Sequence, residues 1–183
     1  MAVNNIIKRI QNIMRQDAGI NGDAQRIEQM TWMFFLKVYD TQEETWEYKD
    51  ASYQSIIPEE LRWRKWAVDE KDGEAMTGEA LLSFVNEKLF PALKNLPVNA
   101  QTPRAKNIVQ ETFADLNQYM KNGTLLRQVV NIVNEIEFDD AEDRHTFGDI
   151  YEGILKDLQS AGNAGEFYTP RALTDFIVKM LDP

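Results

Sequence analysis

The spacing of apolar residues constrains the fold of this chain more than any other feature. Along most of the 183 residues, apolar side chains recur every three to four positions, which is the period of an amphipathic α-helix. Breaks rich in glycine, proline or acidic residues separate these segments. The sequence shows no internal repeat of roughly 20 to 50 residues. The pattern predicts an all-α, multi-helix bundle of about seven helices.

The predicted helices differ in how apolar they are. Their ranges are 3–15, 23–39, 78–96, 102–120, 125–136, 147–158 and 169–181. The segment 23–39 is apolar on nearly every side, so we expect it to be the central, buried helix. Pro91 should bend or split the helix in which it lies.

The segment 43–72 follows no clear period. Its string Leu61-Arg-Trp-Arg-Lys-Trp66 alternates enough for a short strand, and it fits a helical turn after Pro58 equally well. One small β-hairpin near Trp63 and Trp66 therefore stays open beside the helical alternative.

Composition and charge exclude several classes of protein. Hydrophobic residues make up 43% and charged residues 27%, which is typical of a folded protein. The longest apolar stretch, 30–39, is interrupted by Lys37 and is far shorter than the roughly 20 residues that span a membrane. With no cysteine and a single histidine, His145, we expect no metal site. A cytoplasmic protein without a membrane partner is the default expectation.

The formal net charge of −10 repels DNA on average, so any DNA contact must come from a local patch or from a partner subunit. The first 37 residues hold five basic and three acidic side chains, a net +2, and the remainder carries −12. Lys8, Arg9, Arg15 and Arg26 are therefore the candidate DNA contacts, with a solvated helix face as the alternative.

Two other charged strings have alternative interpretations. The cations and aromatic residues of 62–66 suit phosphate contact and base stacking, but an amphipathic edge with both tryptophans packed is the favoured interpretation. The run 135–143 holds six acidic residues in nine positions. It lacks the glycine-centred spacing of a calcium loop, which favours a solvated loop or a surface for a basic partner.

The string Glu166-Phe-Tyr-Thr-Pro-Arg171 is the most informative in the chain. It follows a glycine-containing loop, and Thr169 and Pro170 are typical of the first positions of a helix. The free backbone N–H groups at such a helix start favour a carboxylate or phosphate. The alternative is an ordinary Thr-Pro cap with Phe167 packed in the core.

The run Gly165-Glu-Phe-Tyr-Thr-Pro-Arg171 closely resembles the signature of modification (M) subunits of type I restriction-modification enzymes. The segment 25–37 resembles the first core helix of that family, and 147–155 resembles the helix that introduces the signature. The resemblance thus includes both ends of the chain and, through 81–96, its middle.

This resemblance implies an adenine-N6 DNA methyltransferase that uses S-adenosylmethionine and flips its target base out of duplex DNA. It implies an assembly of two M subunits and one specificity (S) subunit, which a motor-nuclease (R) subunit joins. By resemblance, the signature is motif X, and its residues would line the S-adenosylmethionine pocket. Those residues are Glu166, Phe167, Tyr168, Thr169, Pro170 and Arg171.

The resemblance also divides the chain. Residues 1–160 would form the helical N-terminal domain of the M subunit, and 161–183 the motif X linker with the first helix of the methyltransferase domain. The family's glycine-rich cofactor loop and its Asn-Pro-Pro-aromatic catalytic motif do not occur in these 183 residues. We therefore expect the reading frame to continue past Pro183 into both motifs, and this fragment alone to carry no catalytic residue.

A free-standing interaction or adaptor domain without catalysis is the alternative, and a stop codon directly after Pro183 would favour it. An autonomous DNA-binding domain is disfavoured by the net charge.

Overall fold

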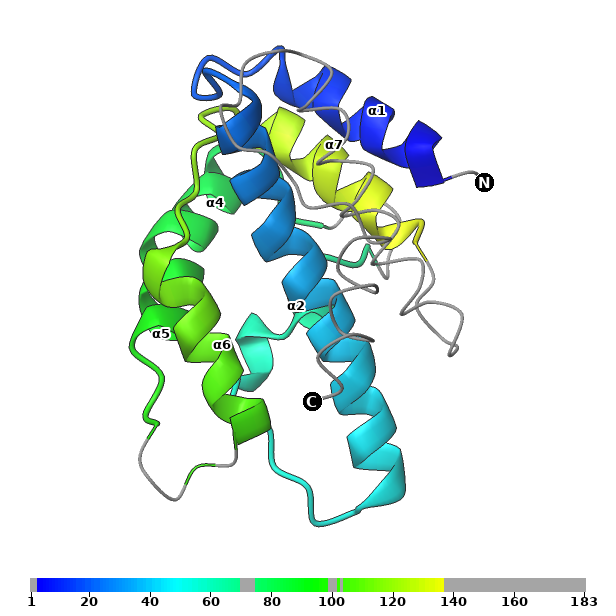
Figure 1. Cartoon of the computed structure of the whole chain (residues 1–183), viewed down its shortest axis with the longest axis vertical. Helices are drawn as coiled ribbons and strands as arrows, with labels where there is room; N and C mark the ends of the chain where they lie inside the picture. The colour runs from blue at the N-terminus through cyan, green and yellow to red at the C-terminus, as the bar shows by residue number, and fades with distance from the viewer. Residues whose placement is uncertain (1–2, 70–74, 99–101, 103, 137–183) are drawn as a thin grey trace, which may run out of the picture.

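A computed structural model describes residues 3–69, 75–98, 102 and 104–136, which fold into a bundle of helices (Figure 1). The elements are α1 (Val3–Met14), α2 (Asp23–Lys49), η1 (Glu59–Leu61), α3 (Trp63–Trp66), α4 (Gly78–Ser83), η2 (Phe84–Leu89), α5 (Phe90–Lys94), α6 (Arg104–Asp115) and α7 (Gly123–Asn134). Within these ranges there is no strand, and the all-α prediction is confirmed. The helices predicted at 147–158 and 169–181 lie outside the described residues.

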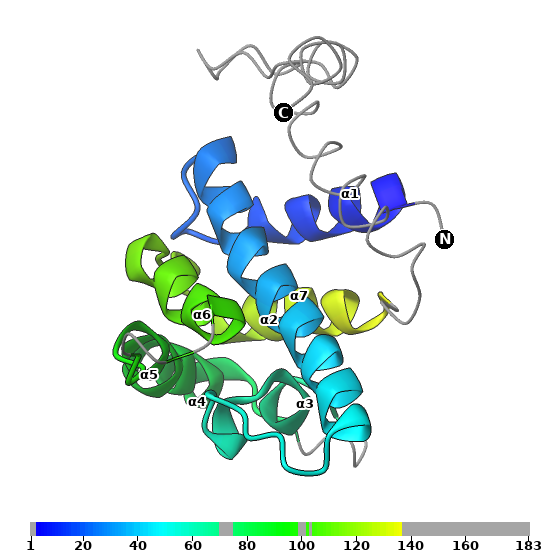
Figure 2. The same cartoon turned by 60° about the horizontal axis from the view of Figure 1, so that its bottom comes forward.

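Helix α2 is the centre of the bundle, as predicted. The side chains of Met30, Trp32 and Met33 are fully buried, and those of Phe34 and Leu36 are nearly so. Helix α1 packs against α7, which packs against α4 and α2. Figures 1 and 2 show α2 crossing the pair formed by α1 and α7. A helix that is apolar on most sides requires such neighbours, because each exposed apolar side would cost free energy.

The aromatic core joins α2 to α5 and α6. The ring of Trp32 meets that of Phe90 edge-on at 5.3 Å between centroids. Phe90 in turn lies 5.2 Å from Phe113 of α6, and Phe35 lies 6.2 Å from the same ring. Edge-to-face pairs of this kind add about 0.5–1.5 kcal/mol each beyond the area that they bury.

Pro91 does not break its helix. Elements α4, η2 and α5 run without interruption from Gly78 to Lys94, and η2 is a π-helical segment just before the proline. The N–H of Phe90 donates to the carbonyl of Val85, five residues back. A proline has no N–H to donate to the carbonyl four residues back, and the wider π turn, with bonds to the carbonyl five residues back, lets the helix continue past this position.

The segment around Trp63 and Trp66 is a helical turn, so the helical alternative holds and the hairpin does not form. The indole N–H of Trp63 donates to Asn134 Oδ1 at 2.7 Å, and that of Trp66 donates to the carbonyl of Leu61 at 3.2 Å. Both rings are buried, at 1% and 3% exposure. Their N–H groups therefore find partners inside the protein, which makes burial of both indoles affordable.

Buried polar side chains hold the connection between α6 and α7 against the start of α2. The carboxylate of Asp17 accepts the backbone N–H groups of Gly19 at 2.7 Å and of Lys121 and Asn122 at 2.9 Å. Gln29 of α2 accepts the backbone N–H of Tyr119 at 2.9 Å. The helix predicted to reach residue 120 therefore ends at Asp115, and residues 116–122 are not helical, since backbone N–H groups in this segment bond to these side chains instead.

The beginnings of α4 and α7 touch through backbone atoms. A Cβ atom added at Gly123 would lie 1.8 Å from the carbonyl oxygen of Gly78 and 2.8 Å from its Cα. Gly78 itself has a φ of 58°, a conformation that favours glycine. This contact brings the two helices closer than any larger residue would allow.

We predict that Gly123→Ala lowers the free energy of unfolding by about 1–3 kcal/mol, because the added methyl group overlaps backbone atoms that have little freedom to move. Urea denaturation followed by circular dichroism measures the effect. Gly22→Ala is the matched control, since nothing lies within 4 Å of its added Cβ. Equal stability of the two variants would show that the contact between Gly78 and Gly123 is not tight.

Candidate functional site

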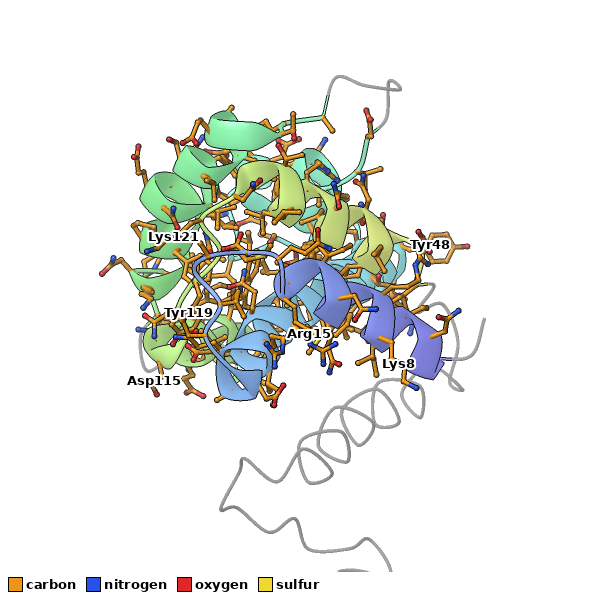
Figure 3. The ribbon with its side chains drawn as sticks, turned by 90° about the horizontal axis from the view of Figure 1, so that it is seen from above. Lys8, Arg15, Tyr48, Asp115, Tyr119 and Lys121 are labelled. Carbon is orange, nitrogen blue, oxygen red and sulfur yellow. The ribbon has the colours of Figure 1, made fainter. Side chains whose placement is uncertain are left out.

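The solvent-facing side of α1 is built from amides and cations. Asn5, Lys8 and Asn12 are exposed along it, and Arg15 and Gln16 follow directly after its last turn. Spacing of three to four residues places these side chains on one face. Lys8 and Arg15 lie on the side of α1 that faces away from α7 (Figure 3). The sequence of α1 contains no acidic residue, so this face offers hydrogen-bond donors and positive charge without a competing carboxylate.

The opposite face of α1 explains why this surface is presented. Ile6, Ile7, Ile10 and Met14 are buried, at 6% exposure or less, and α1 packs against α7. The helix therefore has one orientation that covers its apolar side, and that orientation turns the amides and cations outward.

The four predicted DNA contacts fall into two groups. Arg9 forms two hydrogen bonds with Glu135, at 2.5 and 2.9 Å. Arg26 pairs with Asp23 one turn earlier in α2, and both side chains are largely buried. Lys8 is exposed, and no described carboxylate lies within ion-pair distance of it or of Arg15.

The bidentate pair of Arg9 and Glu135 shifts the pKa of both side chains. The hydrogen bonds between them lower the pKa of the Glu135 carboxyl and raise the pKa of the Arg9 guanidinium. Because both side chains reach solvent, this pair joins α1 to the end of α7 without adding much stability.

Three residues of this face were not among the predicted contacts. The predicted contacts were all cations, whereas Asn5, Asn12 and Gln16 share the surface with Lys8 and Arg15. The signal was present in their spacing along α1, and amide side chains do contact phosphates.

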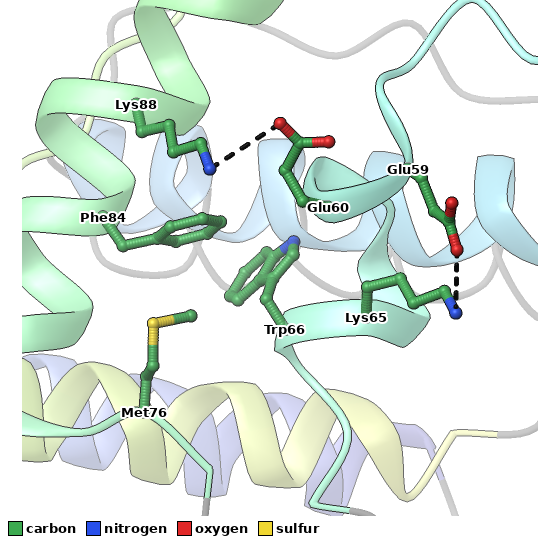
Figure 4. Close-up of a pocket in the computed structure, with 7 residues that line it drawn as sticks. All are labelled: Glu59, Glu60, Lys65, Trp66, Met76, Phe84 and Lys88. Carbon is green, nitrogen blue, oxygen red and sulfur yellow. Dashed lines mark ion pairs between the residues drawn. The ribbon is translucent and has the colours of Figure 1, made fainter.

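The two arginines of 62–66 are held by acidic residues of α2, and Lys65 pairs with Glu59 of η1 (Figure 4). Arg62 Nη1 and Arg64 Nη2 both lie 2.9 Å from Glu47 Oε1. With Trp63 and Trp66 buried, the segment agrees with the packed interpretation and not with a nucleic-acid contact.

Two carboxylates of α2 are buried beneath this segment. Asp40, which is 6% exposed, accepts the backbone N–H of Arg64 at 3.1 Å. Glu43 is fully buried and accepts the hydroxyls of Tyr53 at 2.8 Å and Ser55 at 2.5 Å. Burial raises the pKa of Asp40 to about 6, although the charge of Arg64 and its backbone N–H oppose the rise.

The predicted cofactor segment 166–171 lies outside the described residues, as do His145 and most of the acidic run 135–143. Among the residues that are described, no group of three or more acidic, histidine or cysteine side chains is arranged to hold a metal ion. In the same part of the chain, no helix is long and apolar enough to cross a membrane.

Residues 3–133 match the family described as the HsdM N-terminal domain. The chain belongs to this family. Later in the chain, residues 142–183 match the family described as N-6 DNA Methylase. The resemblance to type I modification subunits is thereby confirmed.

Known relatives agree with this assignment. The chain is 55% identical over 183 residues to the type I restriction enzyme EcoEI methylase subunit of Escherichia coli, and the match covers 100% of this chain and 37% of that relative. It is 27% identical over 140 residues to the StySPI methylase subunit of Salmonella potsdam, covering 74% and 23% respectively. The chain therefore spans little more than a third of the first relative and less of the second.

Solved structures share the fold. A modification subunit assigned to a type I restriction enzyme of Vibrio vulnificus superposes with a TM-score of 0.83 at 35% identity, over 99% of this chain and 40% of that chain. A chain from a structural study of complex assembly and conformational transition of the type I R-M system gives 0.77 at 33% identity, over 100% and 36%.

We predict that Asp40→Asn stabilises the protein at pH 8 and removes part of its pH dependence. A carboxyl whose pKa is raised in the folded state binds its proton more tightly there, so its contribution to stability falls as the pH rises from about 4 to 7. A neutral amide avoids this loss, which amounts to at most about 3 kcal/mol at pH 8 and to less than about 1 kcal/mol at pH 4. Urea denaturation at several pH values measures the difference.

Glu44→Gln is the control for this variant. Glu44 also lies near Arg64, at 3.4 Å, but its side chain is 57% exposed, so its replacement should change stability little. A lower stability of Asp40→Asn than of the wild type at pH 8 would contradict the prediction. It would show that attraction to Arg64 stabilises the Asp40 carboxylate more than burial destabilises it.

Proposed function

We propose that this chain is the N-terminal part of a type I restriction-modification methyltransferase subunit that transfers a methyl group from S-adenosylmethionine to the N6 of adenine in duplex DNA. The observation that carries the proposal is the order of the two family matches, an HsdM N-terminal domain followed by an N-6 DNA Methylase segment. The relatives named above are methylase subunits of type I restriction enzymes. In this proposal, the catalytic residues belong to a region that follows residue 183.

Within such an enzyme, the helical domain would serve subunit assembly and would help to hold DNA. The amide and cation face of α1 supports DNA contact, because exposed lysine, arginine, asparagine and glutamine side chains are the residues that contact phosphates. The net charge of −10 argues that this contact forms only in the assembled enzyme. We propose that the partners of this chain are the S subunit, a second M subunit, the R subunit and double-stranded DNA, and that the assembly forms in the cytoplasm.

The cofactor role rests on the segment 166–171, which lies within the N-6 DNA Methylase match. We propose that Glu166, Phe167, Tyr168, Thr169, Pro170 and Arg171 form one wall of the S-adenosylmethionine pocket. When bound, S-adenosylmethionine supplies the methyl group. The aromatic side chains would provide an apolar wall, and the helix start after Thr169 would provide N–H groups for an anionic group of the ligand.

A free-standing interaction domain is the second candidate. The match of 142–183 to N-6 DNA Methylase favours the catalytic subunit over this alternative, since an adaptor has no need of a cofactor wall.

We predict that Lys8→Ala combined with Arg15→Ala weakens DNA binding by the assembled enzyme and reduces the steepness of its salt dependence. Losing two phosphate contacts should lower the slope of log K against log salt by about 2. Fluorescence anisotropy across a salt series measures both quantities.

The matched control is Lys49→Ala combined with Lys94→Ala, which removes the same charge from the ends of α2 and α5. Equal losses in both double variants would reduce the effect to net charge, and unchanged binding by the first would remove α1 from the DNA surface. Arg9→Ala should leave the slope nearly unchanged, because Arg9 is engaged with Glu135.

We predict that Tyr168→Ala and Thr169→Ala, each in the full-length subunit, weaken S-adenosylmethionine binding without lowering the unfolding temperature of the helical domain. Titration calorimetry measures the affinity, and circular dichroism measures the fold. Tyr48→Ala is the control, because Tyr48 is 93% exposed at the end of α2. Normal cofactor affinity in both variants would disprove the role of this segment.

A further inference from the structure

The sequence contains two Asn-Gly dipeptides, Asn21-Gly22 and Asn122-Gly123. In such a dipeptide the backbone nitrogen of the glycine can attack the side-chain amide carbon of the asparagine, because glycine has no Cβ to block the approach. A C–N bond forms, the amide nitrogen leaves as ammonia with the proton of the glycine N–H, and a five-membered succinimide results. Water then opens either carbonyl of the ring, which gives aspartate or isoaspartate. This reaction needs no enzyme, so the structure around each dipeptide decides its rate.

Asn21 is free to react. It is exposed in the connection between α1 and α2, and none of the described residues forms a hydrogen bond with its side chain. Its backbone N–H donates to Gln25 Oε1 at 2.6 Å, which leaves the side-chain amide unrestrained. An added Cβ at Gly22 would meet nothing within 4 Å. The Asn21 side chain and the following peptide can therefore rotate toward each other without displacing a packed neighbour.

Asn122 is held by four hydrogen bonds at the start of α7. Its side-chain Oδ1 accepts the N–H groups of Thr124 at 2.9 Å and Leu125 at 3.0 Å. Its backbone N–H donates to Asp17 Oδ2 at 2.9 Å, and its carbonyl accepts the N–H of Leu126 at 2.9 Å. The side chain thus caps the helix, and the reaction would have to break this cap.

The backbone geometry of Asn122 also opposes ring closure. With a ψ of 107°, the nitrogen of Gly123 is turned away from the Cβ of Asn122, so the ring forms only if the Cα–C bond rotates. That rotation would move the carbonyl that accepts Leu126. It would also shift Gly123, which is buried directly against the backbone of Gly78. The same dipeptide is therefore locked at one position and open at the other.

We propose that Asn21 is a site of spontaneous modification, which converts to aspartate and isoaspartate in the folded protein, whereas the structure protects Asn122. Asn21 directly precedes Gly22, the N-cap of α2, and a negative charge is favourable near the start of a helix. The converted chain therefore keeps its fold and carries one negative charge more than the −10 of the sequence. The modification is independent of the methyltransferase activity proposed above.

Peptide mapping by mass spectrometry tests the proposal on the full chain. The protein is incubated at mildly alkaline pH, once folded and once unfolded in urea, and trypsin then separates the dipeptides into fragments 16–26 and 122–127. Digestion in water labelled with heavy oxygen marks any conversion that occurs during the digest. In the folded protein, Asn21 should convert faster than Asn122 by about tenfold or more, a ratio that a small difference in activation barrier produces. In urea the two rates should be similar, because both dipeptides are then unrestrained.

Gly22→Ala is the matched variant. Its added methyl group hinders attack by the backbone nitrogen, and the φ of 165° and the open space at Gly22 accommodate alanine. It should slow conversion of Asn21 by about tenfold or more, and leave the rate at Asn122 and the circular dichroism spectrum unchanged. Equal rates at the two asparagines in the folded protein, a tenfold ratio that persists in urea, or an unchanged rate at Asn21 in this variant would each overturn the proposal.

Discussion

Burial of α2 on nearly all sides is the constraint on which the rest of the bundle depends. From residue 29 to residue 36 nearly every side chain of α2 is buried, and α5, α6 and α7 supply the neighbours that cover this stretch. The C-terminal half of α2 carries buried carboxylates, and the segment 53–64 supplies hydrogen-bond donors to them. Tyr53 and Ser55 bind Glu43, and Arg64 binds Asp40. One helix thus determines both the packing of its neighbours and the path of a long irregular segment, because a buried carboxylate without partners costs several kcal/mol.

The same separation of apolar and charged faces produces the candidate DNA surface. Because the isoleucines of α1 are buried against α7, its exposed amides and cations face solvent, and α1 itself contains no acidic residue. A chain with a net charge of −10 can therefore present a local surface that attracts phosphates. Arg9 and Arg26 are near this face, but their acidic neighbours use the charge to hold helices together.

Apolar periodicity was enough to predict the helical class, the central position of α2, and the extents of α1 and α7 to within a few residues. It could not predict that α2 continues to Lys49, since residues 40–49 are mostly polar and their partners come from a later segment. The π turn before Pro91 and the non-helical course of 116–122 also depend on tertiary contacts, here with Gln29 and Asp17. The cationic candidate contacts could be predicted from composition. The pairing of Arg9 with Glu135 could not, because the two residues are 126 positions apart and only the fold brings them together. The cofactor segment 166–171 was found through its signature alone and stays a prediction.

The central claim, which we propose, is that this chain is the N-terminal part of an adenine-N6 methyltransferase subunit, and methyl transfer by the full-length protein tests it most directly. The measurement incubates the full-length subunit and its S subunit with duplex DNA and isotopically labelled S-adenosylmethionine, and then identifies labelled nucleosides by mass spectrometry. Our account predicts labelled N6-methyladenine and no labelled cytosine. Absence of any methyl transfer by a correctly assembled complex, or methylation of a base other than adenine, would contradict it.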